Sequence, residues 1–418
     1  MFKKTLLYFI IFIFSSVITK AQWHQVASIP GEEVSLLANA NDLYAYSESG
    51  LFRSTDEGVS WVSLNQNLVN RNINSLLIIE NNLFVASFSG VFKSTDNGQT
   101  WESISNGLSN NGVYALVCNE TMIFAAASGK NVYSMQINSN QWSEANTGIT
   151  NKSTFSLAIK GNTIFAGAYD FGDTNHLIFR STNNGSNWTS IINGYPAKKS
   201  ANTFCVYGSS LLVGTAGRGI YRTTDDGDQW TPINNGLATA HQEIKSIIAY
   251  GNSLFAATWD GGVYLSTNEG ESWNQINEGL TDKTIFSLTV QDGYLYAGSL
   301  YEDGHIWKRD LSEIITSVED ISTSFPNNFI LEQNYPNPFN PSTTVEYEIT
   351  KPENVKINIY DVNGRMIKEL LKEQKDTGRY SVVWNGKDDS GKMVASGNYF
   401  YQIICGDFAQ AKKMILLK

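Results

Sequence analysis

The sequence predicts an all-β protein: a seven-bladed β-propeller followed by a small Ig-like β-sandwich. Three observations lead to this fold. The stretch RSTDEGVSW, Arg53 to Trp61, returns down the chain as KSTDNGQTW, RSTNNGSNW, RTTDDGDQW and LSTNEGESW. The tryptophans of these boxes and of one weaker copy are 40, 41, 46, 42 and 43 residues apart, a period typical of four-stranded propeller blades. Residues 329–418 lack the box and hold alternating apolar runs, as in a small sandwich.

Each repeat unit contains four short runs that predict antiparallel strands. In the sixth unit they are IKSIIAY, SLFAAT, VYLST and WNQIN, separated by turns rich in Gly, Asn and Asp. The last unit, Thr284 to Asp310, lacks a box and a fourth run. WHQVAS, Trp23 to Ser28, matches that missing run. We therefore expect it to pair into the last unit and close a ring of seven blades, with six or eight as alternatives.

The box itself is interpreted as a turn lock. Asp56 is placed to accept backbone N–H groups of its own turn, Gly58 permits a positive φ, and Trp61 can cover the seam between blades. The Asp becomes Asn in two copies, and an amide cannot act as a general acid and binds calcium more weakly. The expected structural set is Ser54, Asp56, Gly58, Trp61, Ser94, Asp96, Gly98, Trp101, Ser181, Asn183, Gly185, Trp188, Thr223, Asp225, Gly227, Trp230, Ser266, Asn268, Gly270 and Trp273.

A calcium loop at TTDDGD, Thr223 to Asp228, is disfavoured because the bidentate Glu at the twelfth position is missing. The four histidines show no metal-ligand spacing. Three cysteines, Cys118, Cys205 and Cys405, lie in distant apolar runs and are expected to be buried thiols. We predict no catalytic residue in the boxes, no metal and no cofactor.

Boxes of the form SxDxGxTW at blade spacing resemble the Asp-box (BNR) repeats of sialidases, sortilin-type receptors and many secreted bacterial propellers. The resemblance covers roughly residues 23–310, implies that the boxes lie on the face opposite the ligand, and leaves the activity open. A sialidase is disfavoured because the Arg-Ile-Pro motif is absent. Arg53, Arg180 and Arg222 occupy equivalent positions before their boxes and cannot replace the family's arginine triad. Xyloglucanase-like enzymes resemble two such propellers, and this chain has one.

The loops between second and third strands share the other face and vary as a binding rim would. Their aromatic and charged residues are the candidate ligand rim: Tyr169, Asp170, Phe171, Asp173, Arg218, Trp259, Asp260, Tyr301, Glu302 and Asp303. Aromatic side chains beside carboxylates suit a sugar or a peptide, and two carboxylates can serve as a glycosidase pair. We expect a non-catalytic glycan- or protein-binding module, with a glycoside hydrolase as the alternative. Solvated turns without a ligand are the plainest interpretation of the same loops.

The charge is unevenly distributed. Residues 22–326 carry 15 Lys and Arg against 29 Asp and Glu, a net charge of -14, whereas residues 327–418 carry 12 against 11. A domain this acidic is a poor candidate for binding nucleic acid or anionic lipid.

Residues 1–21 resemble a secretory signal peptide. Lys3 and Lys4 precede an apolar run, Leu6 to Phe14, and the segment ends in Thr19, Lys20 and Ala21, which predicts cleavage between Ala21 and Gln22. The nine residues of that run are too few for the roughly 20 that span a bilayer. We therefore expect an exported chain without a transmembrane anchor once mature.

Residues 311–328 are polar and rich in Ser and Thr, which indicates a linker. Residues 329–418 resemble the type A C-terminal sorting domain of the Bacteroidetes type IX secretion system. The matching stretches are NYPNPFNPSTT (Asn334 to Thr344), IYDVNGR (Ile359 to Arg365), WNGKDDSGKMVASGNYFYQI (Trp384 to Ile403) and KKMILLK (Lys412 to Lys418). The resemblance implies the type IX machinery as a partner and passage across the outer membrane, followed by release or surface attachment. An ordinary Ig-like binding module is the alternative.

Overall fold

The fold is described from a computed structural model, in which the chain forms two compact units, Met1–Thr316 and Ser317–Lys418. The described residues are 22–39, 42–68, 72–109, 112–129, 131–149, 153–169, 178–196, 199–300, 303–315, 329–331, 334–349, 352–361, 366–405 and 408–417. The predicted signal peptide, residues 1–21, lies outside the described residues. No helix in these ranges has the length and apolarity that crossing a membrane requires.

The described part of the first unit forms seven four-stranded antiparallel sheets, as the repeat predicts. The first strands of sheets one to six are β2 (Ser35–Asn39), β6 (Ile73–Ile79), β10 (Val113–Cys118), β14 (Ser153–Lys160), β18 (Ala201–Tyr207) and β22 (Ile244–Tyr250). The second strands are β3 (Asp42–Ser47), β7 (Asn82–Ser87), β11 (Met122–Ala127), β15 (Thr163–Tyr169), β19 (Ser210–Thr215) and β23 (Ser253–Thr258).

The third and fourth strands are shorter. The third strands are β4 (Gly50–Ser54), β8 (Gly90–Ser94), β12 (Asn131–Gln136), β16 (Ile178–Ser181), β20 (Ile220–Thr223) and β24 (Gly262–Ser266). The fourth are β5 (Val62–Ser63), β9 (Glu102–Ser103), β13 (Ser143–Glu144), β17 (Thr189–Ser190), β21 (Thr231–Pro232) and β25 (Asn274–Gln275). A single 3-10 turn, η1 (Thr239–His241), precedes β22.

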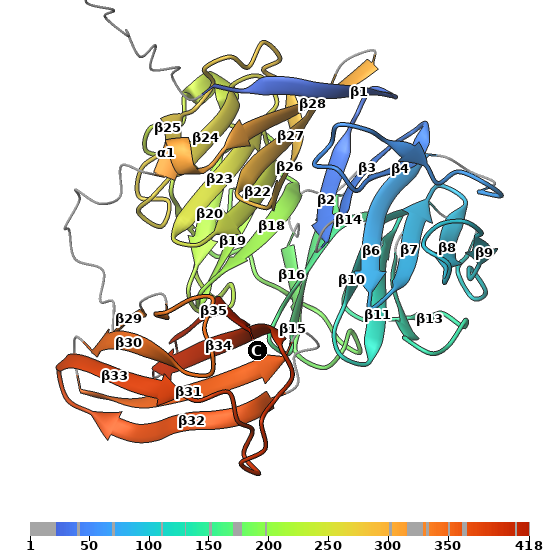
Figure 1. Cartoon of the computed structure of the whole chain (residues 1–418). Coiled ribbons are helices and arrows are strands. Elements are labelled where there is room, and N and C mark those ends of the chain that lie inside the picture. The colour runs from blue at the N-terminus through green and yellow to red at the C-terminus, as the bar shows by residue number, and fades with distance from the viewer. Residues whose placement is uncertain are drawn as a thin grey trace, which may run out of the picture. The chain divides into compact units, whose positions relative to one another are not determined.

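The seventh sheet joins the two ends of the unit. It consists of β26 (Ile285–Gln291), β27 (Tyr294–Ser299), β28 (Asp303–Asp310) and β1 (His24–Pro30), and β1 pairs antiparallel with β28 from His24 opposite Lys308 to Pro30 opposite Asp303. Figure 1 shows β1, in blue, beside β28, in orange. Because β2 also contacts β26, the sheets close into a ring, and the displaced strand lies where the sequence predicts it.

Five box tryptophans each form a hydrogen bond to the preceding sheet. The indole Nε1 of Trp101 donates to the backbone oxygen of Leu64, and Trp142, Trp188, Trp230 and Trp273 repeat this bond at 2.7 to 2.8 Å. Trp23 occupies the same position in the seventh sheet and donates to Ile276 O at 2.6 Å. Trp61 differs, because its Nε1 bonds to Gly58 O within its own turn.

The core of the ring is divided among these seams. Within the described residues, a cluster of buried hydrophobic side chains lies between each pair of neighbouring sheets, including the seventh and the first. Each sheet therefore depends on its neighbours for burial of both faces.

The propeller unit extends slightly beyond its predicted end at residue 310. Leu311 and Ile314 are buried in the cluster between the sixth and seventh sheets, and a short helix, α1 (Ser312–Ile315), carries Ile314 there. The predicted linker of 311–328 therefore starts too early, because two apolar side chains bind its first turn to the ring. Residues 316–328 lie outside the described residues.

The second unit contains two sheets around one core. One holds β29 (Phe329–Leu331), β30 (Thr343–Ile349) and β33 (Gly378–Trp384), and the other holds β32 (Met366–Lys375), β31 (Glu353–Asp361), β34 (Gly397–Cys405) and β35 (Phe408–Leu416). The proline-rich segment, 334–341, contains isolated bridges from Tyr335 to Thr344 and from Phe339 to Leu416. Its Phe339 packs against Trp384 with ring centroids 5.6 Å apart, and its backbone exchanges hydrogen bonds with Ile415 and Leu417.

Candidate functional site

The box turns have the geometry of a structural lock. In the first box the Ser54 hydroxyl donates to Asp56 Oδ1 at 2.8 Å and accepts the N–H of Gly58 at 2.9 Å, while Ser60 N donates to Asp56 Oδ1 at 2.8 Å. The Asn183 and Asn268 copies accept the equivalent N–H through their amide oxygens at 2.9 Å. The amide oxygen and the carboxylate oxygen thus accept the same backbone hydrogen bond, as the turn-lock interpretation requires.

Hydrogen bonds to the carboxylates also shift their ionisation. Donation by the Ser60 hydroxyl, with further donors from the backbone and Ser54, lowers the pKa of Asp56 to about 2. Thr100 does the same for Asp96, whose pKa is also lowered to about 2. Both groups remain ionised at neutral pH, so neither is poised to exchange a proton there.

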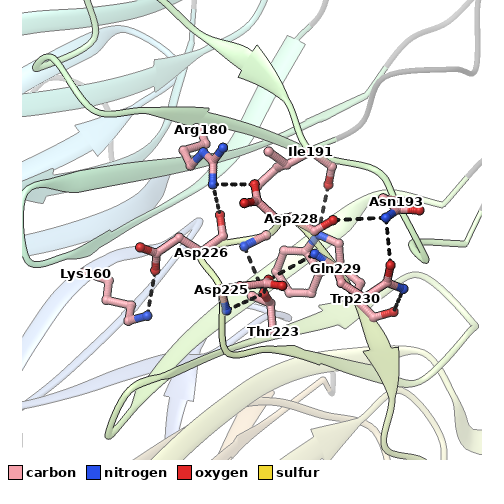
Figure 2. Close-up of polar contacts among 11 residues, drawn as sticks. Lys160, Arg180, Ile191, Asn193, Thr223, Asp225, Asp226, Asp228, Gln229 and Trp230 are labelled. Atoms are coloured by element: carbon pink, nitrogen blue, oxygen red, sulfur yellow. Dashed lines mark hydrogen bonds and ion pairs between the residues drawn. The ribbon is translucent and has the colours of Figure 1, made fainter.

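The box turns also bind the preceding sheet. Figure 2 shows Lys160 of the fourth sheet paired with Asp226 of the fifth box at 2.6 Å, and Arg180 paired with Asp228 at 2.9 Å. Arg222 pairs in the same way with Glu271 of the sixth box, whereas Arg53 pairs with Asp42 within its own sheet. The three arginines that precede boxes are thus committed to ion pairs near the boxes, and they do not converge on a ligand.

The opposite face opens into the central channel. A cavity of about 1040 Å³ is lined by the first strands of all seven sheets, together with Glu48 and Phe88 from loops between second and third strands. The strand order places these loops and the starts of the first strands at one end of the ring, and the box turns at the other. We call the first end the channel mouth.

One repeated position supplies most of the side chains at the mouth. In β6, β10, β18, β22 and β26 a β-bulge occurs at the second residue, and in β14 it occurs at the third; a bulge can redirect a side chain. The bulged residues line the cavity: Asn74, Tyr114, Phe155, Asn202, Lys245 and Phe286. The register of β2 has no bulge, and Glu33, just before that strand, lines the cavity in the first sheet.

The layer below this ring holds the first strands together. The Ser75 hydroxyl accepts the N–H of Leu116 at 3.2 Å, and Ser287 accepts that of Leu36 at 2.9 Å, each across a sheet boundary. The Asn74 amide donates to Val113 O at 2.8 Å in the same way. Backbone groups that no sheet ladder could satisfy are thereby paired, and the positions of the mouth residues are set.

Three aromatic side chains form one side of the mouth, and we call them the aromatic wall: Phe88, Tyr114 and Phe155. The rings of Phe88 and Tyr114 are 5.7 Å apart at 86°, and those of Tyr114 and Phe155 are 4.5 Å apart at 52°. Phe88 is 48% exposed. The rings pack on one another at steep angles, so they do not form a flat platform.

Charged side chains complete the mouth. Three carboxylates of the first sheet, Glu32, Glu33 and Glu48, line the cavity, and we call them the acidic lip. Lys245, from the sixth sheet, pairs with Glu243 at 2.8 Å, and its ammonium lies 4.4 Å from the ring centroid of Trp259 and 4.9 Å from that of Phe286. The channel walls desolvate Glu33 and raise its pKa; Lys245 opposes this, and Glu48 and Glu32 add to it.

The predicted rim is only partly at this site. Trp259 borders it through an edge-to-face contact with Phe286, at a centroid distance of 5.8 Å. Arg218 and Asp260 lie in loops on the same face but do not line the cavity. The backbone N–H of Arg218 donates to the hydroxyl of Thr215 at 3.0 Å. Tyr169 ends β15 and Asp303 begins β28. Asp170, Phe171, Asp173, Tyr301 and Glu302 lie outside the described residues.

Sequence analysis missed the bulged residues. The sequence did contain a signal for them. Each bulged residue directly precedes a small or hydroxyl residue near the start of the first strand of its unit, and the six pairs are NS, YA, FS, NT, KS and FS. That position changes chemical class from unit to unit while its neighbours stay alike. Within the described residues, no group of three or more His, Cys, Asp and Glu side chains could hold a metal ion.

Comparison with known proteins supports the fold of both units. Residues 219–345 match the model of the DUF6242 β-propeller domain, and residues 340–403 match the FlgD Ig-like domain. No curated protein matches the chain. The chain is therefore a β-propeller followed by a β-sheet domain that is similar to the FlgD Ig-like domain over residues 340–403.

Solved structures with propeller folds resemble the chain at low identity. The extracellular domain described as that of a hybrid two-component system of B. thetaiotaomicron has a TM-score of 0.55 at 13% identity, over 96% of this chain and 59% of the other. A structure of YCF48 bound to D1 peptide has a TM-score of 0.54 at 12% identity, over 74% and 99%. YCF48 from Cyanidioschyzon merolae gives 0.51 at 13%, over 72% and 100%. At these identities the likeness concerns the fold alone.

Proposed function

We propose that this protein is an exported, non-catalytic β-propeller of the Asp-box type, which binds a segment of another protein at the channel mouth. One observation carries the proposal. A single structural position, the bulge near the start of six first strands, lines a large cavity and holds amide, aromatic and ammonium groups in different sheets, and the carboxylate of Glu33 lines the same cavity just before β2. A set of polar groups converging with aromatic rings in a concave site is the ordinary form of a binding site.

A protein segment suits this mouth better than a glycan. Sugars stack on flat aromatic faces, whereas the rings of the aromatic wall stand at 86° and 52° to one another. The Lys245 ammonium already lies over Trp259. Irregular aromatic surfaces instead accept the side chains of a peptide. A structural neighbour, YCF48, has been solved bound to a peptide, which supports peptide binding by this architecture.

Hydrolysis of a glycoside is less well supported. Glycosidases place two carboxyl groups on either side of the scissile bond, roughly 5 to 10 Å apart. The carboxylates among the described lining residues are Glu32 and Glu33, just before β2, and Glu48, just after β3, so all three lie beside the first sheet. A substrate in the channel would meet them on one side.

The binding proposal can be tested with the mature full-length chain. It would be applied to an array of capped 12-residue peptides of varied sequence and to a glycan array, with Tyr114→Ala as the site variant. Tyr250→Ala is the matched control, because Tyr250 is exposed at the end of β22, away from the cavity. We expect peptide binding that weakens about tenfold or more in Tyr114→Ala, since aromatic contacts dominate such sites, and is unchanged in Tyr250→Ala. Turnover of a glycoside, or binding of glycans alone, would overturn the proposal.

We further propose export by the type IX secretion system. The signal-like residues 1–21 and the sorting-domain motifs support this route. The motif segments also depend on each other in the fold: Phe339 N donates to Ile415 O at 2.9 Å, and Leu417 N donates to Phe339 O at 2.8 Å. In a type IX host, the full chain should reach the cell surface or medium, and a chain ending at Thr316 should remain inside. Equal export of both would contradict this route.

A further inference from the structure

The charges at the channel mouth do not balance. Its described lining includes three carboxylates, Glu32, Glu33 and Glu48, and one ammonium, Lys245. Lys245 is committed to Glu243 at 2.8 Å. None of the ion pairs among the described residues involves the acidic lip; Glu48 accepts only the backbone N–H of Glu32, at 3.2 Å. Like charges crowded into a channel with low-dielectric walls create a negative potential that favours a cation.

The mouth contains an internal example of how it holds a cation. The Lys245 ammonium lies between a carboxylate, Glu243, and the faces of two aromatic rings, Trp259 and Phe286. A cation gains from an ion pair and from the ring quadrupole together. The acidic lip, at the first sheet, and the aromatic wall, which runs from the second sheet to the fourth, supply the same two kinds of group, and Phe88, in the sheet next to the lip, is 48% exposed.

We infer that the bound protein segment presents a basic side chain, arginine or lysine, which inserts between the acidic lip and the aromatic wall. This inference rests on the proposed function and specifies its ligand. An arginine is the better fit, because its planar guanidinium stacks on aromatic rings and can pair with two carboxylates at once. The partial desolvation of Glu33 supports this arrangement, since a cation beside Glu33 would favour its ionised form.

The test uses capped pentapeptides of the form Ac-Ala-Ala-X-Ala-Ala-NH2, where X is Arg, Lys, Gln or Glu. Each would be titrated by calorimetry into the mature full-length chain and into the double variant Glu33→Gln, Glu48→Gln. Glu102→Gln is the control, because Glu102 is exposed in β9 and does not line the cavity. We expect the Arg and Lys peptides to bind at least about tenfold more tightly than the Gln and Glu peptides. Their binding should weaken with salt and in the double variant, and be unchanged in Glu102→Gln.

The outcomes separate the two proposals. Equal affinity for the Arg, Gln and Glu peptides, with binding still lost in Tyr114→Ala, would contradict the proposal of a basic side chain. The proposal that the mouth binds a protein segment would then still hold. Full Arg-peptide binding by a folded double variant, judged by an unchanged melting temperature, would also overturn it. If none of the peptides binds at millimolar concentration, both the basic side chain and the protein-binding function fail.

Discussion

The two ends of the ring use repetition in opposite ways. At the box end, each full repeat has the same hydroxyl, the same Asx oxygen and the same glycine, and these groups bond to one another or to the preceding sheet. At the channel mouth, one repeated position holds Asn74, Tyr114, Phe155, Asn202, Lys245 or Phe286, and the first sheet, which lacks the bulge, has Glu33 just before its first strand. A position that repeats both in place and in chemistry serves the scaffold. One that repeats in place but varies in chemistry is available for recognition.

The box end should govern stability, and the tryptophan seam should have the largest effect. Trp23 is 2% exposed and bonds to Ile276 O, whereas Trp61 is half-buried and bonds within its own turn. Trp23→Ala should lower the free energy of unfolding by about 3 to 5 kcal/mol, as for other buried aromatic side chains. Trp61→Ala should cost clearly less in the same denaturant titration. Equal losses would contradict the role of β1 as the strand that closes the ring.

A hydroxyl below the mouth should have an intermediate effect. Ser287 accepts the N–H of Leu36 at 2.9 Å, across the boundary between the seventh and first sheets. Ser287→Ala leaves that buried N–H unpaired and should cost about 1 to 3 kcal/mol in urea unfolding. Ser287→Thr keeps the hydroxyl, as Thr203 does in the fifth sheet, and should restore most of the loss. If threonine is no better than alanine, packing rather than the hydrogen bond matters there.

The box carboxylates should have a smaller effect that depends on pH. The pKa of Asp56 and of Asp96 is lowered to about 2 from 3.8, so the folded protein favours their ionised forms. Their stabilisation is present above pH 3.8 and is lost as the pH falls towards 2. The double variant Asp56→Asn, Asp96→Asn keeps the turns, because Asn183 and Asn268 do so. It should melt at a slightly lower temperature than the wild type at pH 7, and at the same temperature near pH 2. A gap that does not vary with pH would contradict this account.

The smallest effect on stability is expected at the mouth. Burial raises the pKa of Glu33 from 4.5, opposed by Lys245 and reinforced by Glu48 and Glu32. The protonated form is thus favoured by folding, and its stabilisation fades as the pH rises through that raised pKa. Glu33→Gln should change the free energy of unfolding by no more than about 0.5 kcal/mol at pH 7. Over the same pH range the wild type should gain affinity for the Arg pentapeptide as Glu33 ionises, and Glu33→Gln should not. If the affinities of the wild type and of Glu33→Gln change with pH in the same way, a group other than Glu33 causes the change in affinity.

Much of the ring could be predicted because its information is local and repeated. The spacing of the tryptophans marks the units, WHQVAS matches the missing strand, and the exchange of Asp56 for Asn183 or Asn268 identifies a hydrogen-bond acceptor rather than an acid. The candidate site was predicted less well. Loop composition pointed to Arg218 and Asp260, which do not line the cavity, and to Trp259, which borders it.

The sequence by itself determined the repeat, the place of the closing strand and the structural role of the boxes, because each depends on neighbours within a few residues or on a match between units. The tertiary structure decided which side chains meet. A bulge near the start of each of six first strands places one residue at the channel, and Glu33 lies there just before the strand without a bulge. Only the packing of seven sheets brings these residues together. The physical reason is that register and ring closure are properties of strand pairs and sheet contacts, and neither is written in any one segment of the chain.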